Sequence, residues 1–237
     1  MPVSVLDMSM SLDGYIAGPN DDVGNPGGDD FAPLHAWAFT PDGQSFRSDG
    51  PGGQVMGEVA GTGAVLVGRR TAEQVDHWGG DHHGRGVRIF VPSHRPPGPS
   101  VANYPLVTYV TDGIESAMAQ AKAAAGDRDV LVHGAFTAQR AIEAGVLDEL
   151  QIHHIPVLFG GGRRLFDVLP SRVPLEIIRV IDTPRRPTSG TASGADPPSP
   201  ARAEATPQST HATDVGLLAA SHAHLRVGVR VVASPDP

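Results

Sequence analysis

The chain has 237 residues, a formal net charge of −8 and no cysteine. Its length is enough for one large domain with a full hydrophobic core, and the missing cysteines exclude disulfide bonds and thiolate metal ligands. The negative charge argues against general binding to nucleic acids or anionic membranes, because such binding depends on clustered Lys and Arg.

The first residues predict a strand at 3–8, followed by the segment SLDGYIAG. The N-terminus has no basic region joined to a long apolar stretch, and no run of about 18 apolar residues occurs, so we expect a cytoplasmic protein without a membrane span. Two interpretations of Asp13 in SLDG are open. Its carboxylate faces a substrate, with a pKa raised by desolvation, or it is a turn residue that bonds its own backbone.

Residues 19–57 are rich in Gly, Pro and Asp and form a long predicted loop. We expect a short helix around Leu34 to Phe39 and expect the loop to form one wall of a substrate cleft, because long loops in compact domains are often functional. A surface loop held by a few aromatic side chains is the other interpretation. Asp49 and Glu58 are further candidate carboxylates.

The next two predicted strands both end in residues suited to phosphate. Strand 64–67 runs into Gly68, Arg69, Arg70 and Thr71, and strand 87–91 ends in the segment Pro92-Ser93-His94-Arg95-Pro96. A guanidinium binds phosphate oxygens in a bidentate manner, so these strand ends are candidate anion sites.

A strand at 106–110 precedes a helix at 113–125, for which Thr111 or Asp112 is the expected N-cap. The apolar strand 130–133 then breaks at Gly134, and the following helix has a stripe of small residues at Ala138, Ala141, Ile142 and Gly145, with Thr137 as its expected N-cap. Gly134, Ala135 and Phe136 therefore lie where helix N–H groups favour an anion such as a pyrophosphate, although a simple tight turn also needs glycine.

The predicted strand 150–159 holds His153 and His154, and a change in its apolar phase suggests a β-bulge at this pair. The chain has 11 histidines, but none has the spacing of a metal site, so no metal is predicted. The glycines at 160–162 allow close approach of backbone to a ligand, or form a flexible turn.

Strands 175–181 and 224–232 are predicted to close the fold as an antiparallel pair, because no helical pattern separates them. Residues 185–222 contain a low-complexity insertion, of which 185–213 has no hydrophobic period. We expect this insertion to be disordered and without a catalytic role. Alternating strands and helices predict an α/β fold with right-handed crossovers, built as one domain over 1–237.

Four segments together carry a family resemblance: SLDGYIAG, VGRRT, VPSHRP and DELQIHHIPVLFGGGRRLFD. In this order they resemble the dihydrofolate reductase-like superfamily, and within it the stand-alone relatives of the C-terminal reductase domain of the bifunctional riboflavin-biosynthesis deaminase-reductase. The resemblance covers about 3–183 and a strand near 224–232. It implies a mostly parallel sheet flanked by helices, NADPH as hydride donor, a pteridine-like or ribosylaminopyrimidine-like acceptor, and a homodimer.

The resemblance also implies roles for single residues. Gly68, Arg69, Arg70 and Thr71 would lie at the adenosine and phosphate end of NADPH, with Ser93, His94 and Arg95 near its 2′-phosphate. The turn of Gly134, Ala135, Phe136 and Thr137 would take the pyrophosphate. Ala17 and the loop of Gly160, Gly161 and Gly162 would border the nicotinamide, and Asp13 would face the substrate as the catalytic carboxylate.

One departure from the family pattern concerns the pyrophosphate turn. Relatives have two adjacent glycines there, whereas this chain has Gly134 followed by Ala135 and the bulky Phe136. Two functions are therefore weighed: an NADPH-dependent reductase, and a dimeric small-molecule binding protein that keeps the fold without using the cofactor. A ribosylaminopyrimidine, dihydrofolate and an unrelated small carbonyl compound all remain open as substrates.

Overall fold

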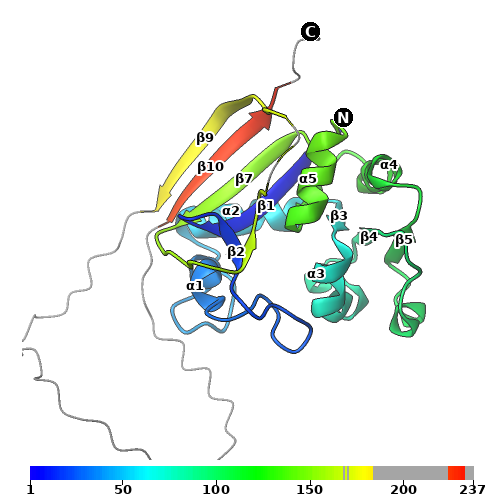
Figure 1. Cartoon of the computed structure of the whole chain (residues 1–237), viewed down its shortest axis with the longest axis horizontal. Coiled ribbons are helices and arrows are strands. Elements are labelled where there is room, and N and C mark those ends of the chain that lie inside the picture. The colour runs from blue at the N-terminus through cyan, green and yellow to red at the C-terminus, as the bar shows by residue number, and fades with distance from the viewer. Residues whose placement is uncertain (168, 170, 184–223, 233–237) are drawn as a thin grey trace, which may run out of the picture.

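The computed structural model describes residues 1–167, 169, 171–183 and 224–232. A single eight-stranded sheet forms its centre, in the order β5-β4-β3-β6-β1-β7-β10-β9 (Figure 1). The strands are β1 (Ser4–Ser11), β3 (Ala64–Val67), β4 (Arg88–Pro92), β5 (Val107–Val110), β6 (Val130–His133), β7 (Glu149–Ile155), β9 (Leu175–Thr183) and β10 (His224–Val231). The two short strands β2 (Tyr15–Ala17) and β8 (Arg163–Arg164) pair apart from this sheet.

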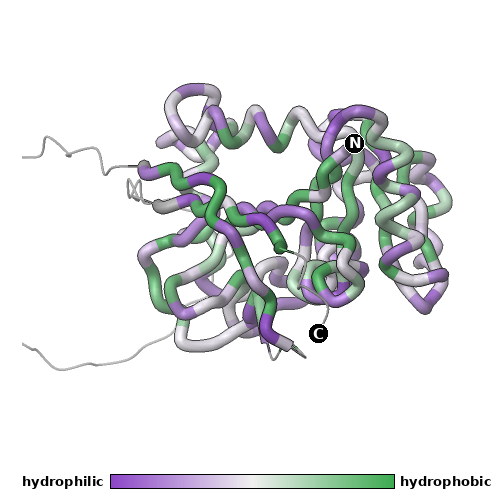
Figure 2. The backbone as a smooth tube through the Cα atoms, turned by 90° about the horizontal axis from the view of Figure 1, so that it is seen from above, coloured by the Kyte–Doolittle hydropathy of each residue, from purple (hydrophilic) through white to green (hydrophobic). Residues whose placement is uncertain are grey.

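Six neighbouring strands, from β5 to β7, are parallel, and β10 is antiparallel to both β7 and β9. The predicted α/β fold with an antiparallel C-terminal strand pair is confirmed. The strand β10 alternates polar and apolar residues along its length, which is the pattern of a strand with one face in solvent. Figure 2 shows how polar and apolar residues are interspersed along the backbone. The predicted insertion at 185–222 lies outside the described residues.

The apolar side chains of the central strands divide between two cores. Leu66 of β3 and Val132 of β6 pack with α4 (Ile114–Ala125) and α5 (Ala135–Glu143) on one face of the sheet. The neighbouring Val65 and Leu131 point to the other face, toward α3 (Arg69–Gln74) and the end of α2 (Gly50–Gly61). Complete burial of both faces explains why these strands read as continuous apolar runs rather than as alternating ones.

Both helix starts after β5 and β6 differ from the prediction. The N-caps of α4 and α5 are Gly113 and Gly134, with φ of 100° and 95°, and neither helix has a side-chain cap. Thr111 and Asp112 precede the cap of α4, and Thr137 lies inside α5 instead of capping it. The left-handed glycine turns the chain directly from strand into helix, which leaves no position for a side-chain cap.

The predicted loop at 19–57 contains more helix than its composition suggests. The expected short helix is present as α1 (Ala32–His35) and the 3-10 turn η1 (Ala36–Ala38), but the start of α2 was missed. Glycines and Pro51 fill its first turns, which disfavours a helix on local propensity. Tertiary packing overrides this: a Cβ on the buried Gly53 would lie 2.3 Å from the Ser48 backbone, so only glycine permits the close approach.

The β-bulge predicted at His153 and His154 is wrong. β7 pairs with β1 in continuous register from Glu149 to Ile155, and its register with β10 is also unbroken at this pair. His153 is fully buried and bonds Asp7, whereas His154 is partly buried on the opposite face. Regular alternation therefore accommodates both rings. Within the described residues, no helix is both long and apolar enough to cross a membrane.

Candidate functional site

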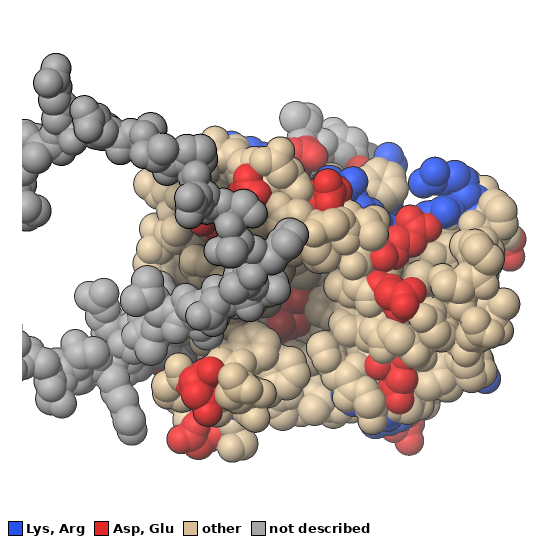
Figure 3. All heavy atoms as spheres, turned by 90° about the horizontal axis from the view of Figure 1, so that it is seen from below, with Lys and Arg blue, Asp and Glu red and all other residues tan. Residues whose placement is uncertain are grey.

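The carboxyl ends of the parallel strands meet at one edge of the sheet, and a cavity of about 770 Å³ lies there. One side is formed by the residues that follow β3, β4, β5 and β6. The other side is formed by β1, β2, the loop after β2 and α1. The protein is hollowed on the face drawn in Figure 3, where acidic side chains are spread over the surface. A cavity at the carboxyl edge of a parallel sheet is the usual ligand position in such folds.

Most of the residues predicted for a cofactor line this cavity. Gly68, Ser93 and Gly134, which follow three different strands, share it, so the predicted convergence of strand ends is confirmed. The other predicted residues that line it are Ala17, Arg69, Arg70, Thr71, His94, Arg95, Ala135, Phe136 and Thr137. Asp13, Gly160 and Gly161 are not among the lining residues.

The turn after β6 packs tightly against the turn after β3. A Cβ on Gly134 would lie 3.3 Å from Thr71 Oγ1, and one on Gly68 would lie 2.7 Å from Thr137 Oγ1. This contact aims the first turn of α5 at the cavity, and the N–H groups of a first turn have no partner within the helix. Phe136 leaves the turn open, because its ring is 67% exposed and lies beneath the Arg140 guanidinium, 4.9 Å away.

Positive charge is concentrated in the cavity although the whole chain carries −8. Five arginines line it and Asp21 is the single carboxylate among its described lining residues, which gives a formal charge of +4 with neutral histidines. The arginines are Arg69, Arg70, Arg95, Arg140 and Arg163. Such a lining attracts an anionic ligand, since walls of one charge focus the field within a cleft.

Asp21 joins three elements across this cavity. Its carboxylate accepts from Arg70 Nε and Arg163 Nε, each at 3.2 Å, and from the Gln74 side chain, and it is only 8% exposed. These hydrogen bonds hold its pKa below the usual range, although burial opposes them. The sequence analysis missed Asp21 because nothing local distinguishes it from the other acidic residues of the same loop.

Arg69 has a structural contact as well as a place in the cavity. Its Nε bonds Glu73 at 2.6 Å, and its Nη1 donates to Ser93 Oγ and to the Pro96 carbonyl, both at 3.2 Å. It thereby fixes the loop after β4 to the start of α3. Arg95 on that loop is exposed, and its backbone N–H and carbonyl both bond Ser93 Oγ. Its guanidinium has no hydrogen bond or ion pair to a described residue and remains available for a ligand.

The side of the cavity formed by β1, β2 and α1 is mostly apolar. Met8, Ile16 and Phe31 line it, together with the partly buried His35 of α1; a second partly buried histidine, His133, ends β6 and lines the cavity from the other side. Burial lowers the pKa of each histidine to about 4, so both are neutral at pH 7. Neither was predicted as a site residue, although a histidine that ends a buried strand was a usable signal.

Asp13 holds the glycine loop instead of entering the cavity. Its carboxylate accepts from Ser11 Oγ at 2.5 Å and from the N–H groups of Phe159 and Gly160 at 3.1 and 2.7 Å. The Ser11 hydroxyl and these amides lower its pKa to about 2. The expectation of a raised pKa is wrong, because hydrogen bonds to the charged form outweigh desolvation.

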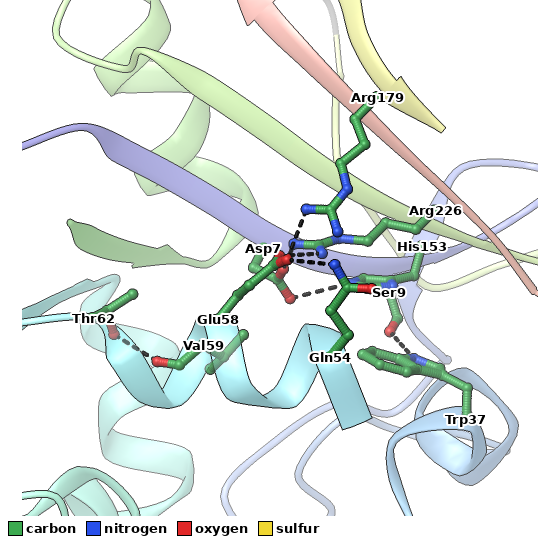
Figure 4. A network of polar contacts seen from close by, with 10 residues as sticks. All are labelled: Asp7, Ser9, Trp37, Gln54, Glu58, Val59, Thr62, His153, Arg179 and Arg226. Carbon is green, nitrogen blue, oxygen red and sulfur yellow. Dashed lines mark hydrogen bonds and ion pairs between the residues drawn. The ribbon is translucent and has the colours of Figure 1, made fainter. Parts of the chain in front are cut away.

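The other candidate carboxylates also lie outside the cavity lining. Glu58 of α2 bonds Arg226 Nη1 and Arg179 Nη1, both at 2.7 Å, and Arg226 Nη2 bonds Asp7 at 3.0 Å (Figure 4). Asp7 and Arg226 are buried in this ion network, whereas Glu58 and Arg179 are 38% and 32% exposed. The network lies between α2 and the strands β1, β7, β9 and β10. Asp49 is the N-cap residue of α2, with no side-chain cap bond.

The chemistry of the lining fits NADPH. The arginines and the first turn of α5 match its phosphates, and the apolar side accommodates an uncharged ring. Among the described residues, no group of three or more His, Asp or Glu side chains is placed so that it could hold a metal ion.

Comparison with protein families matches residues 2–185 to the model described as the RibD C-terminal domain. No curated protein matches the chain. A solved structure from Shewanella sp. PV-4, of a protein proposed to act in riboflavin biosynthesis, is similar with a TM-score of 0.62 and 18% identity, over 98% of this chain and 99% of that one.

Two further structures share the fold. Dihydrofolate reductase from Enterococcus faecalis, solved with NADP(H) and an inhibitor named RAB-propyl, has a TM-score of 0.51 and 13% identity, over 97% of this chain and 96% of that one. The diaminohydroxyphosphoribosylaminopyrimidine deaminase/5-amino-6-(5-phosphoribosylamino)uracil reductase of Thermotoga maritima has a TM-score of 0.50 and 12% identity, over 98% of this chain and 57% of that one.

Proposed function

The chain belongs to the RibD C-terminal domain family of dihydrofolate reductase-like, NADPH-dependent reductases, and from this membership we propose that it transfers a hydride from NADPH to a small unsaturated molecule. The observation that carries the proposal is the cavity of five arginines and one carboxylate at the carboxyl edge of the sheet. Five guanidiniums gathered in one cavity of a chain of −8 have a specific use if the ligand is a multiply charged anion, even with Arg69 and Arg140 paired to Glu73 and Glu143 outside the lining.

When bound, NADPH supplies the hydride from its nicotinamide ring. The residues of this chain then act mainly by position: the first turn of α5 and Arg70 would hold the pyrophosphate, and Ser93 with Arg95 would hold the 2′-phosphate. Ala17 and Ile16 would pack against the nicotinamide and exclude water. Holding both reactants in line is the main contribution of a protein to hydride transfer.

The structure changes the proposed source of the proton. Asp13, with its pKa of about 2, is ionised throughout the working range and holds the loop at Phe159 and Gly160. It is therefore a poor acid, and we propose that water entering the cavity protonates the reduced product. Asp13 then acts as a positioning residue that sets the path of the chain between β7 and β8.

NADPH titration tests the proposal directly. The chain has two tryptophans, so quenching of protein fluorescence reports binding, and we expect a dissociation constant in the micromolar range. Arg95→Ala should weaken NADPH binding about tenfold and leave NADH binding unchanged, since only NADPH has the 2′-phosphate. Arg128→Ala is the matched control, because Arg128 is exposed before β6, at the opposite edge of the sheet. Absence of NADPH binding up to millimolar concentration would contradict the function.

The binding-protein alternative has less support. It requires Phe136 to fill the pyrophosphate turn, and the ring is instead 67% exposed at the rim of the cavity. We therefore keep the reductase as the proposed function.

We also propose the homodimer that the resemblance implies. The edge strand β9 exposes Leu175, Ile177 and Val180, at 50%, 67% and 56%, and an exposed apolar edge strand favours pairing with another chain. Light scattering should give twice the mass of the chain, and Ile177→Lys should shift it toward the monomer. A monomer for the unaltered chain at micromolar concentration would contradict this proposal.

A further inference from the structure

The arginines that line the cavity have carboxylate partners of two kinds. Arg69 and Arg140 bond glutamates of their own helices, Glu73 at 2.6 Å and Glu143 at 2.7 Å, which do not line the cavity. Such pairs form between neighbouring turns of one helix and need no other element. They therefore connect nothing across the cavity.

Arg70 and Arg163 instead share one carboxylate, that of Asp21. Arg70 belongs to α3 and Arg163 to β8, and the Nε of each bonds the same oxygen, Asp21 Oδ2, at 3.2 Å. The other oxygen accepts from the Gln74 side chain and from the Gly27 N–H. Phosphate oxygens bind guanidinium groups in the same way as carboxylate oxygens. Asp21 therefore occupies a position that suits a phosphate oxygen of a ligand.

Asp21 lies in the loop 18–29, which is closed at its base and bonded within itself. The Gly18 N–H donates to the Gly27 carbonyl at 2.8 Å, and the two asparagine side chains of the loop donate to the Asp29 carboxylate at 2.7 and 2.9 Å. Compact loops whose ends lie close together are held by their own residues and are frequently functional. The loop can therefore keep its shape when its contacts to other elements are lost.

The same loop spans the cavity from one side to the other. It follows β2 and extends toward α3 (Figure 1), and among the described residues its hydrogen bonds to α3 and β8 all go to Asp21. The guanidiniums of Arg70 and Arg163 are open to solvent, whereas the Asp21 side chain is only 8% exposed. An anion that takes both guanidiniums from Asp21 would also release the loop.

On the premise of the proposed reductase function, we propose that Asp21 is an internal anion that competes with the diphosphate of the cofactor for Arg70 and Arg163. Cofactor binding exchanges the carboxylate for phosphate oxygens, and the loop 18–29 moves away from α3 and β8. No covalent bond changes in this exchange.

The exchange also makes Asp21 a residue that selects among anions. Replacing one anionic oxygen by another at the same two guanidiniums gains little free energy, so a ligand needs contacts that Asp21 does not make. A diphosphate can reach the first turn of α5 as well as the arginines, whereas a single inorganic phosphate gains the arginines alone. Small anions are therefore excluded as long as the carboxylate is present.

Engineered cysteines can report the position of the loop. The chain has no cysteine of its own, so spin labels on Val23→Cys and Ala119→Cys mark an exposed residue of the loop and one of α4. NADPH and inorganic pyrophosphate should each change the distance between the labels by more than about 2 Å, and inorganic phosphate at the same concentration should not. The pair Ala60→Cys and Ala119→Cys, on α2 and α4, is the control and should keep its distance.

Two variants in this labelled background separate the exchange from a general loosening of the loop. Asp21→Asn should give the open distance without ligand and bind pyrophosphate about tenfold more tightly, because the competing charge is gone. Arg163→Gln should also open the loop but should weaken pyrophosphate binding about tenfold, because a ligand group is lost. Calorimetry measures both affinities. Asp22→Asn is the matched control, since Asp22 bonds the backbone of its own loop.

The failures of the two proposals are distinguishable. If NADPH does not bind, the reductase function fails, and a loop that still moves with pyrophosphate supports the exchange. If NADPH binds at an unchanged label distance, or if Asp21→Asn changes neither the distance nor the affinity, the exchange is wrong and the function stands. Inorganic phosphate that moves the loop as strongly as pyrophosphate would overturn the role of Asp21 in selecting the anion.

Discussion

Two clusters in this molecule contain the same kinds of residue but have different surroundings. In the cavity, Asp21 lies between Arg70 and Arg163, whose side chains are 51% and 44% exposed. In the ion network behind β1, Asp7 and Arg226 are only 10% and 3% exposed. An arginine near solvent can exchange its partner for a ligand, whereas one enclosed by the fold cannot.

The position of a charged side chain in the fold determines whether it stabilises the tertiary structure or can bind a ligand. The ion network connects Glu58 of α2 to β1 and β10 through the buried Arg226, so removal of that arginine leaves Asp7 without its guanidinium partner and costs stability. The cavity charges lie at strand ends, where a ligand can reach them. Histidines divide in the same way: His153 bonds Asp7 within the network, and His133 lines the cavity.

We expect the largest change in the free energy of unfolding when the ion network is disrupted. Arg226→Met keeps an unbranched apolar stem but leaves Asp7 and Glu58 without their shared partner, so unfolding free energy should fall by about 3–5 kcal/mol. Arg230→Met on the same strand is the control, because Arg230 is 55% exposed in its pair with Glu149 and should change stability by less than about 1 kcal/mol. Chemical denaturation measures both. If Arg226→Met and Arg230→Met lowered the free energy of unfolding equally, the ion network would not differ in stability from an exposed ion pair.

The next effect concerns the turn that positions the α5 amides. Gly134→Ala forces an L-residue to adopt a φ of 95°, which should cost about 1–3 kcal/mol of stability and weaken NADPH binding about tenfold as the turn shifts. Gly57→Ala is the contrasting variant. Its Cβ meets open space in the middle of α2, so it should stabilise the protein by about 0.5–1 kcal/mol. A Gly134 variant that binds NADPH normally would remove this turn from the site.

A smaller effect is expected from the carboxylate of the cavity. Asp21→Asn removes the negative charge between Arg70 and Arg163 and should tighten NADPH binding about tenfold, because the local potential becomes more positive. Asp22→Asn is the control, since Asp22 bonds the backbone of its own loop and does not line the cavity. Fluorescence titration at fixed ionic strength measures both. Weaker binding in the Asp21 variant would mean that the loop contact matters more than its charge.

The smallest effect is a pH dependence from the cavity histidines. The pKa of His35 and of His133 is about 4 in the fold and about 6.5 in the unfolded chain. The unfolded chain therefore binds more protons below pH 6.5, and stability is lost as pH falls from 6.5 toward 4. The loss should be about 1 kcal/mol for each histidine at pH 5.5, seen as a lower Tm. His133→Phe should reduce this slope, and an unchanged slope would assign the acid sensitivity to other groups.

Local patterns were sufficient for the architecture and for one side of the cavity. The apolar runs of β3 and β6, the glycines after them and the basic residues after β3 and β4 are all readable in short segments. Parallel strands bring their carboxyl ends to a common edge, so Gly68, Ser93 and Gly134 could be grouped before any coordinates were known.

Only the tertiary structure shows which residues form the other side of the cavity and which groups pair with the charged side chains. Nothing near Asp21 or His35 in the chain indicates that they line this cavity. The partners of Asp21, for example, are Gln74 and Arg163, which lie 53 and 142 residues away in the sequence. Asp13 is the opposite case, in which the local motif suggested a role that the tertiary structure does not support. Its motif suggested a catalytic acid, yet its carboxylate oxygens accept hydrogen bonds from the N–H groups of Phe159 and Gly160. Periodicity records which face of an element is buried, whereas the pKa and the availability of a side chain depend on what long-range packing places beside it.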